Sequence, residues 1–318
     1  MSPFPHNYHF DPSYGYNLER LLHLLPPEEP PDFATFWLTR YHRVLGYRTE
    51  PSLWMEDQRH PRFETHYFGY RSTDGVHISG WLLIPRVGNA RRVVVVGHGY
   101  GGWAAPDFDL PVRDSMFAFP CFRGLSRSRC APYSDNPSWH VLHDIDKRDR
   151  YVLGGCVEDL WLAISALLEL FPHLVGHIGY MGISFGGGIG ALGFPWDERI
   201  RRVHLNVPTF GHQPIRINLP TLGSGEAVRG FQRRHGNVLD TLRYYDAALG
   251  AKYSRIPVHV AAALFDPYVA PPGQFAIYNA LPEPKRLFVL EAGHFEYPRG
   301  MEQKRQLLSE LEDFFETL

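Results

Sequence analysis

Short apolar runs alternate along the chain with longer amphipathic segments. Six runs are typical of strands: RRVVVVG at 91–97, MFAFPCFRG at 116–124, HIGYMGIS at 177–184, RRVHLNVP at 201–208, IPVHVAAALFD at 256–266 and RLFVLEAGH at 286–294. Residues 157–171 and 301–318 repeat apolar positions every three or four residues, which predicts amphipathic helices. This alternation predicts an α/β fold whose mostly parallel central sheet carries helices on both faces.

The first part of the chain follows different patterns. Residues 1–31 are rich in proline, tyrosine and histidine without a clear period, so we expect an N-terminal arm lying over a neighbouring surface. Asp32 can cap a helix that ends near Gly46. The β-rich runs on either side of Asp74 and Gly75 predict a hairpin, so antiparallel strands should begin the sheet.

Length and composition favour one domain over residues 1–318. The chain has 318 residues and is 44% hydrophobic, enough for a large core, and no repeat interrupts it. Between residues 208 and 255 the alternation pauses in a polar stretch that contains glycine. We expect this stretch to form a small helical cap insertion over the carboxyl edge of the sheet.

The net charge and the cysteines limit the classes of binding partner and site that the sequence favours. The net charge of −2 leaves no broad basic field for nucleic acid or an anionic membrane, so a small-molecule substrate fits better. Three cysteines without CxxC spacing indicate reduced thiols rather than a disulfide framework or a zinc ribbon. Without a secretory pattern or an apolar run of about 18 residues, the sequence predicts a cytoplasmic protein.

The segment GYMGISFGGGIGAL at 179–192 places Ser184 between Gly182 and Gly186, directly after a predicted strand. A serine on a sharp strand-to-helix turn needs such glycines, because larger side chains would collide where the turn tightens. Glycine-rich turns also arise from packing alone. The preceding strand, and a following GGGIGAL that can begin a helix, favour a nucleophilic serine.

A serine hydroxyl needs a histidine base, itself oriented by a carboxylate. Asp266 follows one predicted strand and His294 follows the next, which matches the chain order serine, acid, histidine of α/β-hydrolases. Asp266 before proline could simply start a turn, and one of 17 histidines after a strand is not rare. All three residues in the required order favour a catalytic triad.

A tetrahedral intermediate needs two amide donors. Phe185 can supply the amide after the nucleophile, and Tyr100 in GHGYGG can supply the other, although that glycine-rich segment could be a mere turn. A metal site of His98 with Asp266, His294 and Glu296 is the alternative. The zincin spacing is absent, so we predict neither a metal nor a cofactor.

Together these motifs resemble those of the acetyl xylan esterase and cephalosporin-C deacetylase family of α/β-hydrolases. The resemblance covers nearly everything after residue 30 and rests on the motifs PPDFATFW, GHGYGG, GISFGGGIGAL, LFDPYVAPPGQFAIYNAL and AGHFE. It implies Ser184 as nucleophile, Asp266 as acid and His294 as base, with the Tyr100 and Phe185 amides as oxyanion hole. Many members form hexameric rings, so a homo-oligomer is possible.

Three positions depart from the family pattern. Leu125 replaces the glutamine of an arginine-glycine-glutamine motif, Phe185 replaces the glutamine after the nucleophile, and Phe295 displaces the glutamate that normally follows the histidine. We expect these changes to alter the polarity of the pocket. The Phe185 ring in particular should shift preference from hydroxyl-rich toward apolar alcohol portions.

The sequence therefore predicts a carboxylic ester hydrolase that removes O-acetyl groups from small substrates such as acetylated sugars, through an acyl-enzyme on Ser184. One alternative is a serine peptidase of the prolyl-oligopeptidase type, although no propeller repeats are present to filter peptides. Another is a ligand-binding relative that has lost catalysis, against which the intact triad argues.

Overall fold

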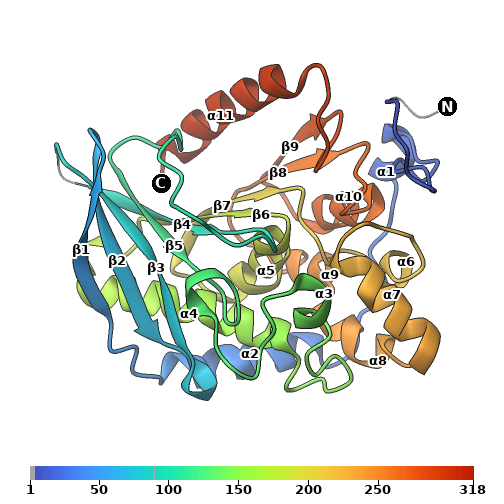
Figure 1. Ribbon diagram of the computed structural model, residues 1–318, viewed down its shortest axis with the longest axis horizontal. Helices are drawn as coiled ribbons and strands as arrows, with labels where there is room; N and C mark the ends of the chain where they lie inside the picture. Colours follow the sequence, from blue (N-terminus) through green and yellow to red (C-terminus); the bar gives the residue numbers. More distant parts are fainter. Residues whose placement is uncertain (1–3, 89) are drawn as a thin grey trace.

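A nine-stranded sheet runs through the protein in the computed structural model, which describes residues 4–88 and 90–318 (Figure 1). The strands are β1 (Ser52–Arg59), β2 (Phe63–Arg71), β3 (His77–Pro85), β4 (Arg92–Gly97), β5 (Ser115–Pro120), β6 (Ile178–Ile183), β7 (Ile200–Asn206), β8 (Val258–Ala263) and β9 (Lys285–Leu290). Their order is β1-β2-β3-β5-β4-β6-β7-β8-β9. Strands β4 to β9 are parallel, and β1, β2 and β3 are antiparallel, so the predicted α/β-hydrolase fold is confirmed.

The predicted hairpin is confirmed, but β1 was not predicted. Strands β2 and β3 pair without a register break from Phe63 opposite Pro85 to Arg71 opposite His77. At their turn Asp74 and Gly75 have φ angles of 59° and 71°, a left-handed conformation that aspartate and glycine tolerate. Strand β1 pairs only with β2 at the sheet edge and carries several charged residues, so its sequence lacks a clean alternation.

Eleven α-helices occur in the described residues, and the three helices expected from the sequence are α2, α4 and α11. The helices are α1 (Leu18–Leu22), α2 (Phe33–Leu45), α3 (Pro137–His140), α4 (Val152–Leu170), α5 (Phe185–Gly193), α6 (Gln213–Arg216), α7 (Ser224–His235), α8 (Leu239–Leu242), α9 (Ala247–Ala251), α10 (Pro271–Ala280) and α11 (Gly300–Glu316). Within these described residues, none is both long and apolar enough to cross a membrane.

The segment expected as a cap holds α6 to α9. Residues from its first half, including Thr209 and Ser224, line a large cavity at the carboxyl edge of the sheet. Helix α9 instead packs against α5 and α10 in the main helical layer. The division of the chain into one domain with a cap stays a prediction.

The handedness of the crossovers places almost all helices on one face of the sheet. The connections β5 to β6, β6 to β7, β7 to β8 and β8 to β9 all move in the same direction along the strand order, so right-handed crossovers put their helices on the same side. Helices α4, α5, α9 and α10 belong to these connections, and α2 packs against α4. Figure 1 shows α2 and α4 on one side of the sheet and α11 on the other.

Only the connection from β4 to β5 moves the opposite way and must cross the second face. This segment, residues 98–114, consists of turns, bends and irregular backbone. It begins GYGG after His98 and contains Pro106 and Pro111, which explains why it forms no helix. The second face is therefore covered by this loop and by α11, whose Leu307, Leu311 and other apolar residues pack toward it.

The expected N-terminal arm lies over the loops that follow β8 and β9. The ring of Phe4 is 5.3 Å from that of Phe265 and 5.7 Å from that of Phe295, centroid to centroid. The carbonyl of Pro12 accepts a hydrogen bond of 3.1 Å from the amide of Asp266. The neighbouring surface left unidentified by the sequence is thus the part of the fold that carries Asp266 and His294.

Candidate active site

Ser184 is on a strained turn between β6 and α5. Its φ of 54° and ψ of −109° are rarely adopted by residues other than glycine, and such strain concentrates at functional sites. The Ser184 amide donates to the carbonyl of Asn206 at the end of β7, and the Gly186 amide donates to the carbonyl of His98 at the end of β4, both at 2.8 Å. The turn is thereby fixed to both neighbouring strands.

Glycines beside Ser184 are required by close backbone contact. A Cβ on Gly182 would be 2.5 Å from the carbonyl oxygen of Gly186, and a Cβ on Gly186 would be 2.5 Å from the carbonyl oxygen of Gly97. Real Cβ atoms do not approach other atoms that closely. The glycine pattern around Ser184 therefore reflects steric necessity at the turn, as the sequence predicts.

Asp266 follows β8 and is fully buried. Its Oδ1 accepts hydrogen bonds of 2.9 Å from the amides of Tyr268 and Val269, and its Oδ2 accepts one of 3.1 Å from Nε2 of Gln274 on α10. Gln274 also accepts from the amide of Ala263, so this buried amide ties the carboxylate to β8. Sequence reasoning missed Gln274, although it lies within the family-like stretch around the acid.

His294 follows β9 with its Nδ1 2.8 Å from Oδ2 of Asp266. A Cβ on the preceding Gly293 would be 2.5 Å from that same Oδ2, so only glycine leaves room for this pairing. Burial lowers the pKa of His294, but the charge and hydrogen bond of Asp266 outweigh it, and the net pKa is raised above the usual value. The carboxylate thus favours a protonated imidazole.

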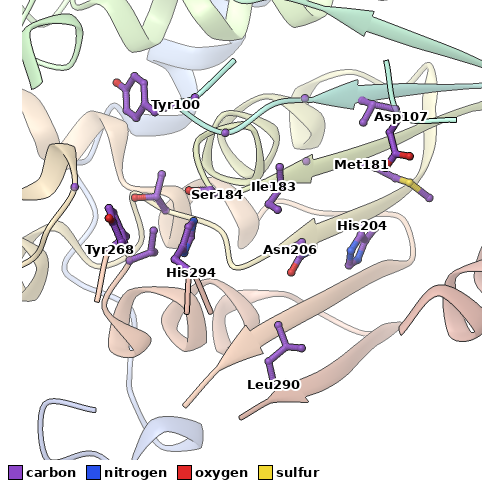
Figure 2. Close-up of a pocket in the computed structure, with 18 of the residues that line it drawn as sticks. Tyr100, Asp107, Met181, Ile183, Ser184, His204, Asn206, Tyr268, Leu290 and His294 are labelled. Atoms are coloured by element: carbon purple, nitrogen blue, oxygen red, sulfur yellow. The ribbon is translucent and has the colours of Figure 1, made fainter. Parts of the chain in front are cut away.

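One cavity of about 920 Å³ brings Ser184 and His294 together. Figure 2 shows the two side chains beside each other, with Tyr268 next to them. Asp266 is not part of the cavity wall; it lies behind His294, hydrogen-bonded to it. Of the three residues that the sequence singled out, Ser184 and His294 therefore line the same cavity, and Asp266 is hydrogen-bonded to His294 behind its wall.

The two amides predicted for the oxyanion hole belong to Phe185, which directly follows Ser184, and to Tyr100, which lines the same cavity. Within the residues that the structure describes, neither amide donates a hydrogen bond to another protein group. Tyr100 lines the cavity, and its loop is held by the buried His98, whose Nδ1 is 2.6 Å from the Gly99 carbonyl and whose Nε2 accepts from the Phe122 amide. Burial lowers the pKa of His98 to about 4, so this imidazole is neutral.

Both ring nitrogens of His98 are thus engaged by backbone groups. Among residues 4–88 and 90–318, no group of three or more histidine, cysteine, aspartate or glutamate side chains is placed to hold a metal ion. Two polar atoms in buried parts of the cavity wall have no protein partner in those residues: Nε1 of Trp103 and Oδ1 of Asn206. One is a donor and the other an acceptor, and sequence patterns did not single out either residue.

The prediction that the Phe185 ring faces the alcohol portion of the substrate is wrong. The ring is fully buried, 4.1 Å from the Tyr100 ring and 5.5 Å from the Phe122 ring, and it does not line the cavity. As the first residue of α5, Phe185 directs its side chain into the core rather than toward substrate. Leu125 is also buried away from the cavity, and Phe295 packs on the arm. None of the three departures lines the cavity.

The sequence matches the acetyl xylan esterase family over residues 17–311. The chain belongs to the acetyl xylan esterase family. As a member of this family, it is a carboxylic ester hydrolase of the serine esterase type and acts as an acetyl esterase.

Solved structures with this fold include two acetyl xylan esterases. The enzyme from Paenibacillus sp. R4 matches with a TM-score of 0.81 and 20% identity, over 93% of this chain and 99% of that one. Acetyl xylan esterase 1 from Thermoanaerobacterium sp. JW/SL YS485 matches at 0.79 and 19%, over 95% and 99%. An acylaminoacyl peptidase from Pyrococcus horikoshii matches at 0.63 and 16%, over 81% of this chain and 42% of that one.

The buried position of Phe185 changes what its replacement should do. Phe185→Gln places an amide among rings without partners, so we expect the free energy of unfolding to fall by about 1–3 kcal/mol. The ratio of kcat/KM between an aryl acetate and an acetylated xylo-oligosaccharide should change less than about threefold, because the ring does not face substrate. Chemical denaturation and parallel kinetics measure both quantities.

Tyr268→Gln is the matched control for the stability of Phe185→Gln, because Tyr268 lines the cavity and is 44% exposed. Its unfolding free energy should stay within about 0.5 kcal/mol of the wild type. A Phe185→Gln protein with unchanged stability and a shifted substrate ratio would show that the ring faces the alcohol portion after all.

Proposed function

We propose that Ser184, His294 and Asp266 form the catalytic triad of this esterase, with the Tyr100 and Phe185 amides as oxyanion hole. The observation that most supports this proposal is the 2.8 Å contact between His294 Nδ1 and Asp266 Oδ2 beside a cavity that also contains Ser184. The contact orients the imidazole so that its other nitrogen, Nε2, is free for the serine.

In the first step, Nε2 of His294 accepts the Ser184 proton while Oγ attacks the ester carbonyl carbon. The carbonyl oxygen becomes an oxyanion, for which amide donors such as those of Tyr100 and Phe185 are worth about 3 kcal/mol each. The intermediate then collapses: the bond to the alcohol oxygen breaks, and His294 returns its proton to the departing alcohol. The acyl group remains on Ser184.

Hydrolysis of the acyl-enzyme completes the cycle, with water taking the place of the alcohol. His294 removes a proton from water, the resulting hydroxide adds to the acyl carbon, and the proton passes to Ser184 as the carboxylic acid leaves. Throughout, Asp266 stabilises the imidazolium that forms transiently. Its four hydrogen-bond donors, Tyr268, Val269, Gln274 and His294, hold it in place.

The substrate class that we propose is small O-acetyl esters, including acetylated sugars. Thr209, Ser224 and Tyr268 line the cavity on the cap side of Ser184, and their hydroxyl groups can bind a hydroxyl-rich alcohol. Family membership supports ester rather than peptide hydrolysis. A cytoplasmic location and a homo-oligomeric state stay predictions.

Replacing the nucleophile gives the direct test of the triad. Ser184→Ala should lower kcat on an aryl acetate by roughly 10³-fold or more, because triad residues act as a unit. Ser309→Ala, the same substitution at an exposed site on α11, is the control and should retain wild-type turnover. A Ser184→Ala protein with a tenth of wild-type turnover would rule out Ser184 as the nucleophile.

The pH dependence tests His294 separately. The base must be neutral, so kcat/KM should fall as the pH drops through the raised pKa of His294, with a midpoint above the ordinary histidine value of about 6.5. In Asp266→Asn the charge that raises the pKa of His294 is lost while its burial remains. The midpoint of the pH–rate profile should therefore move to lower pH, and the overall activity of the variant should be lower. pH–rate profiles of both proteins measure this, and an equal or higher midpoint in the variant would contradict the assignment.

A further inference from the structure

The cavity that contains Ser184 is much larger than an acetyl group requires. Its volume is about 920 Å³, near the upper end of the roughly 300–1,000 Å³ found for pockets that enclose drug-sized ligands. An acetyl group has only three heavy atoms. Most of the cavity must therefore accommodate something other than the acetyl portion of a substrate.

Two different parts meet at Ser184. The cap side carries Thr209, Ser224 and Tyr268. The other part, which we call the sheet-side channel, runs between the second face of the sheet and α11. It is lined chiefly by Val96, Met181, Leu290, Leu307, Leu308 and Leu311. In Figure 2, Ser184, Tyr268 and His294 lie toward one end of the cavity, and Met181, His204 and Asp107 toward the other.

The helix-free connection from β4 to β5 accounts for this channel. It is the one crossover that right-handedness sends across the second face, and it supplies turns where a helix would fill the space between β4, β6 and α11. The result is visible at Ile183, the last residue of a strand that is otherwise fully buried, which is 38% exposed and lines the cavity.

The channel is long enough for a medium-length chain. Met181 lies three residues before Ser184 on β6, a distance of roughly 10 Å along a strand. Neighbouring positions extend the floor of the channel sideways, since Val96 on β4 and His204 on β7 both pair with Met181. An extended chain of about eight carbons would span this length.

Apart from Trp103 Nε1 and Asn206 Oδ1, the polar groups in the channel do not oppose an alkyl chain. His204 is buried with its Nδ1 3.0 Å from Nδ1 of His259, and burial lowers its pKa, so it is neutral. Asp107 and Lys304 also line the cavity, but both are exposed to solvent at its rim. The charged groups therefore stay hydrated when the apolar middle of the channel is filled.

We propose that the sheet-side channel binds the acyl chain of aliphatic esters of about six to ten carbons, so that this esterase accepts acyl groups well beyond acetyl. The proposal rests on the function proposed for Ser184. The acyl group stays on Ser184 while the alcohol must leave, and the cap side offers hydroxyl groups suited to a polar alcohol. The bonds formed and broken are those of the acetyl reaction, whatever the chain length.

A series of p-nitrophenyl esters from acetate to decanoate tests the acyl side. Each methylene that enters the channel should raise kcat/KM, by at most about fourfold, and we expect octanoate to exceed acetate by at least about tenfold over its six additional methylenes. A second series of acetates with alcohols from ethanol to octanol keeps the acyl group constant. We expect a much weaker dependence on length in this second series.

Filling the channel gives a structural control. Leu308 lines the channel and is partly exposed, so Leu308→Trp should fold and should lower the octanoate-to-acetate ratio of kcat/KM at least about tenfold. Ser309→Trp adds the same side chain at the neighbouring exposed position, outside the cavity wall, and should leave that ratio unchanged. A KM increase for octanoate alone would accompany the loss in Leu308→Trp.

The outcomes separate this inference from the proposed function. Acetate hydrolysis that depends on Ser184, combined with rates that fall beyond butyrate, would overturn the channel proposal and leave the triad intact. A rise with alcohol length instead of acyl length would assign the channel to the alcohol and also overturn it. Hydrolysis of every ester by Ser184→Ala would instead contradict the proposed function.

Discussion

The right-handedness of crossovers between parallel strands decides where the helices of this protein lie. Each crossover between parallel strands that runs toward β9 places its helices on one face of the sheet. There they enclose a large core that includes Trp37, Trp161 and Phe275. The single connection that moves the other way must protect the opposite face. Because glycine and proline prevent a helix there, α11 and an irregular loop share that task and leave a hollow beside Ser184.

The candidate active site depends on the same arrangement of strands. Ser184, Asp266 and His294 follow β6, β8 and β9, whose carboxyl ends meet at one edge of the sheet. Backbone hydrogen bonds from β4 and β7 hold the strained serine turn, while Gln274 and the amides after Asp266 hold the carboxylate. The ends of the strands thus fix the positions of the three side chains, and the loops between the strands form the rest of the site. The chain thus belongs to an acetyl esterase family and has a large cavity on the second face of its sheet, beside Ser184.

Patterns that repeat along the sequence predicted most of this fold. Apolar runs identified β4 to β9, of which β4, β5, β6 and β8 are almost entirely buried and the edge strand β9 only partly; periodicity identified α4 and α11, and a predicted cap identified α2. Motif order placed Ser184, Asp266 and His294 correctly at strand ends. Two features could not be predicted: the direction of the Phe185 ring, which depends on packing against Tyr100 and Phe122, and the channel, whose volume depends on how far α11 stands from the sheet.

The central claim is that Ser184 opens onto an apolar channel between β6 and α11. A crystal structure of the protein after reaction with an octyl-bearing fluorophosphonate tests it most directly, because the probe bonds covalently to an activated serine. We expect one adduct, on Ser184 Oγ, with the octyl chain lying against Met181, Leu290 and Leu307. An unlabelled Ser184, or an octyl chain extending past Tyr268 toward the cap, would contradict the claim.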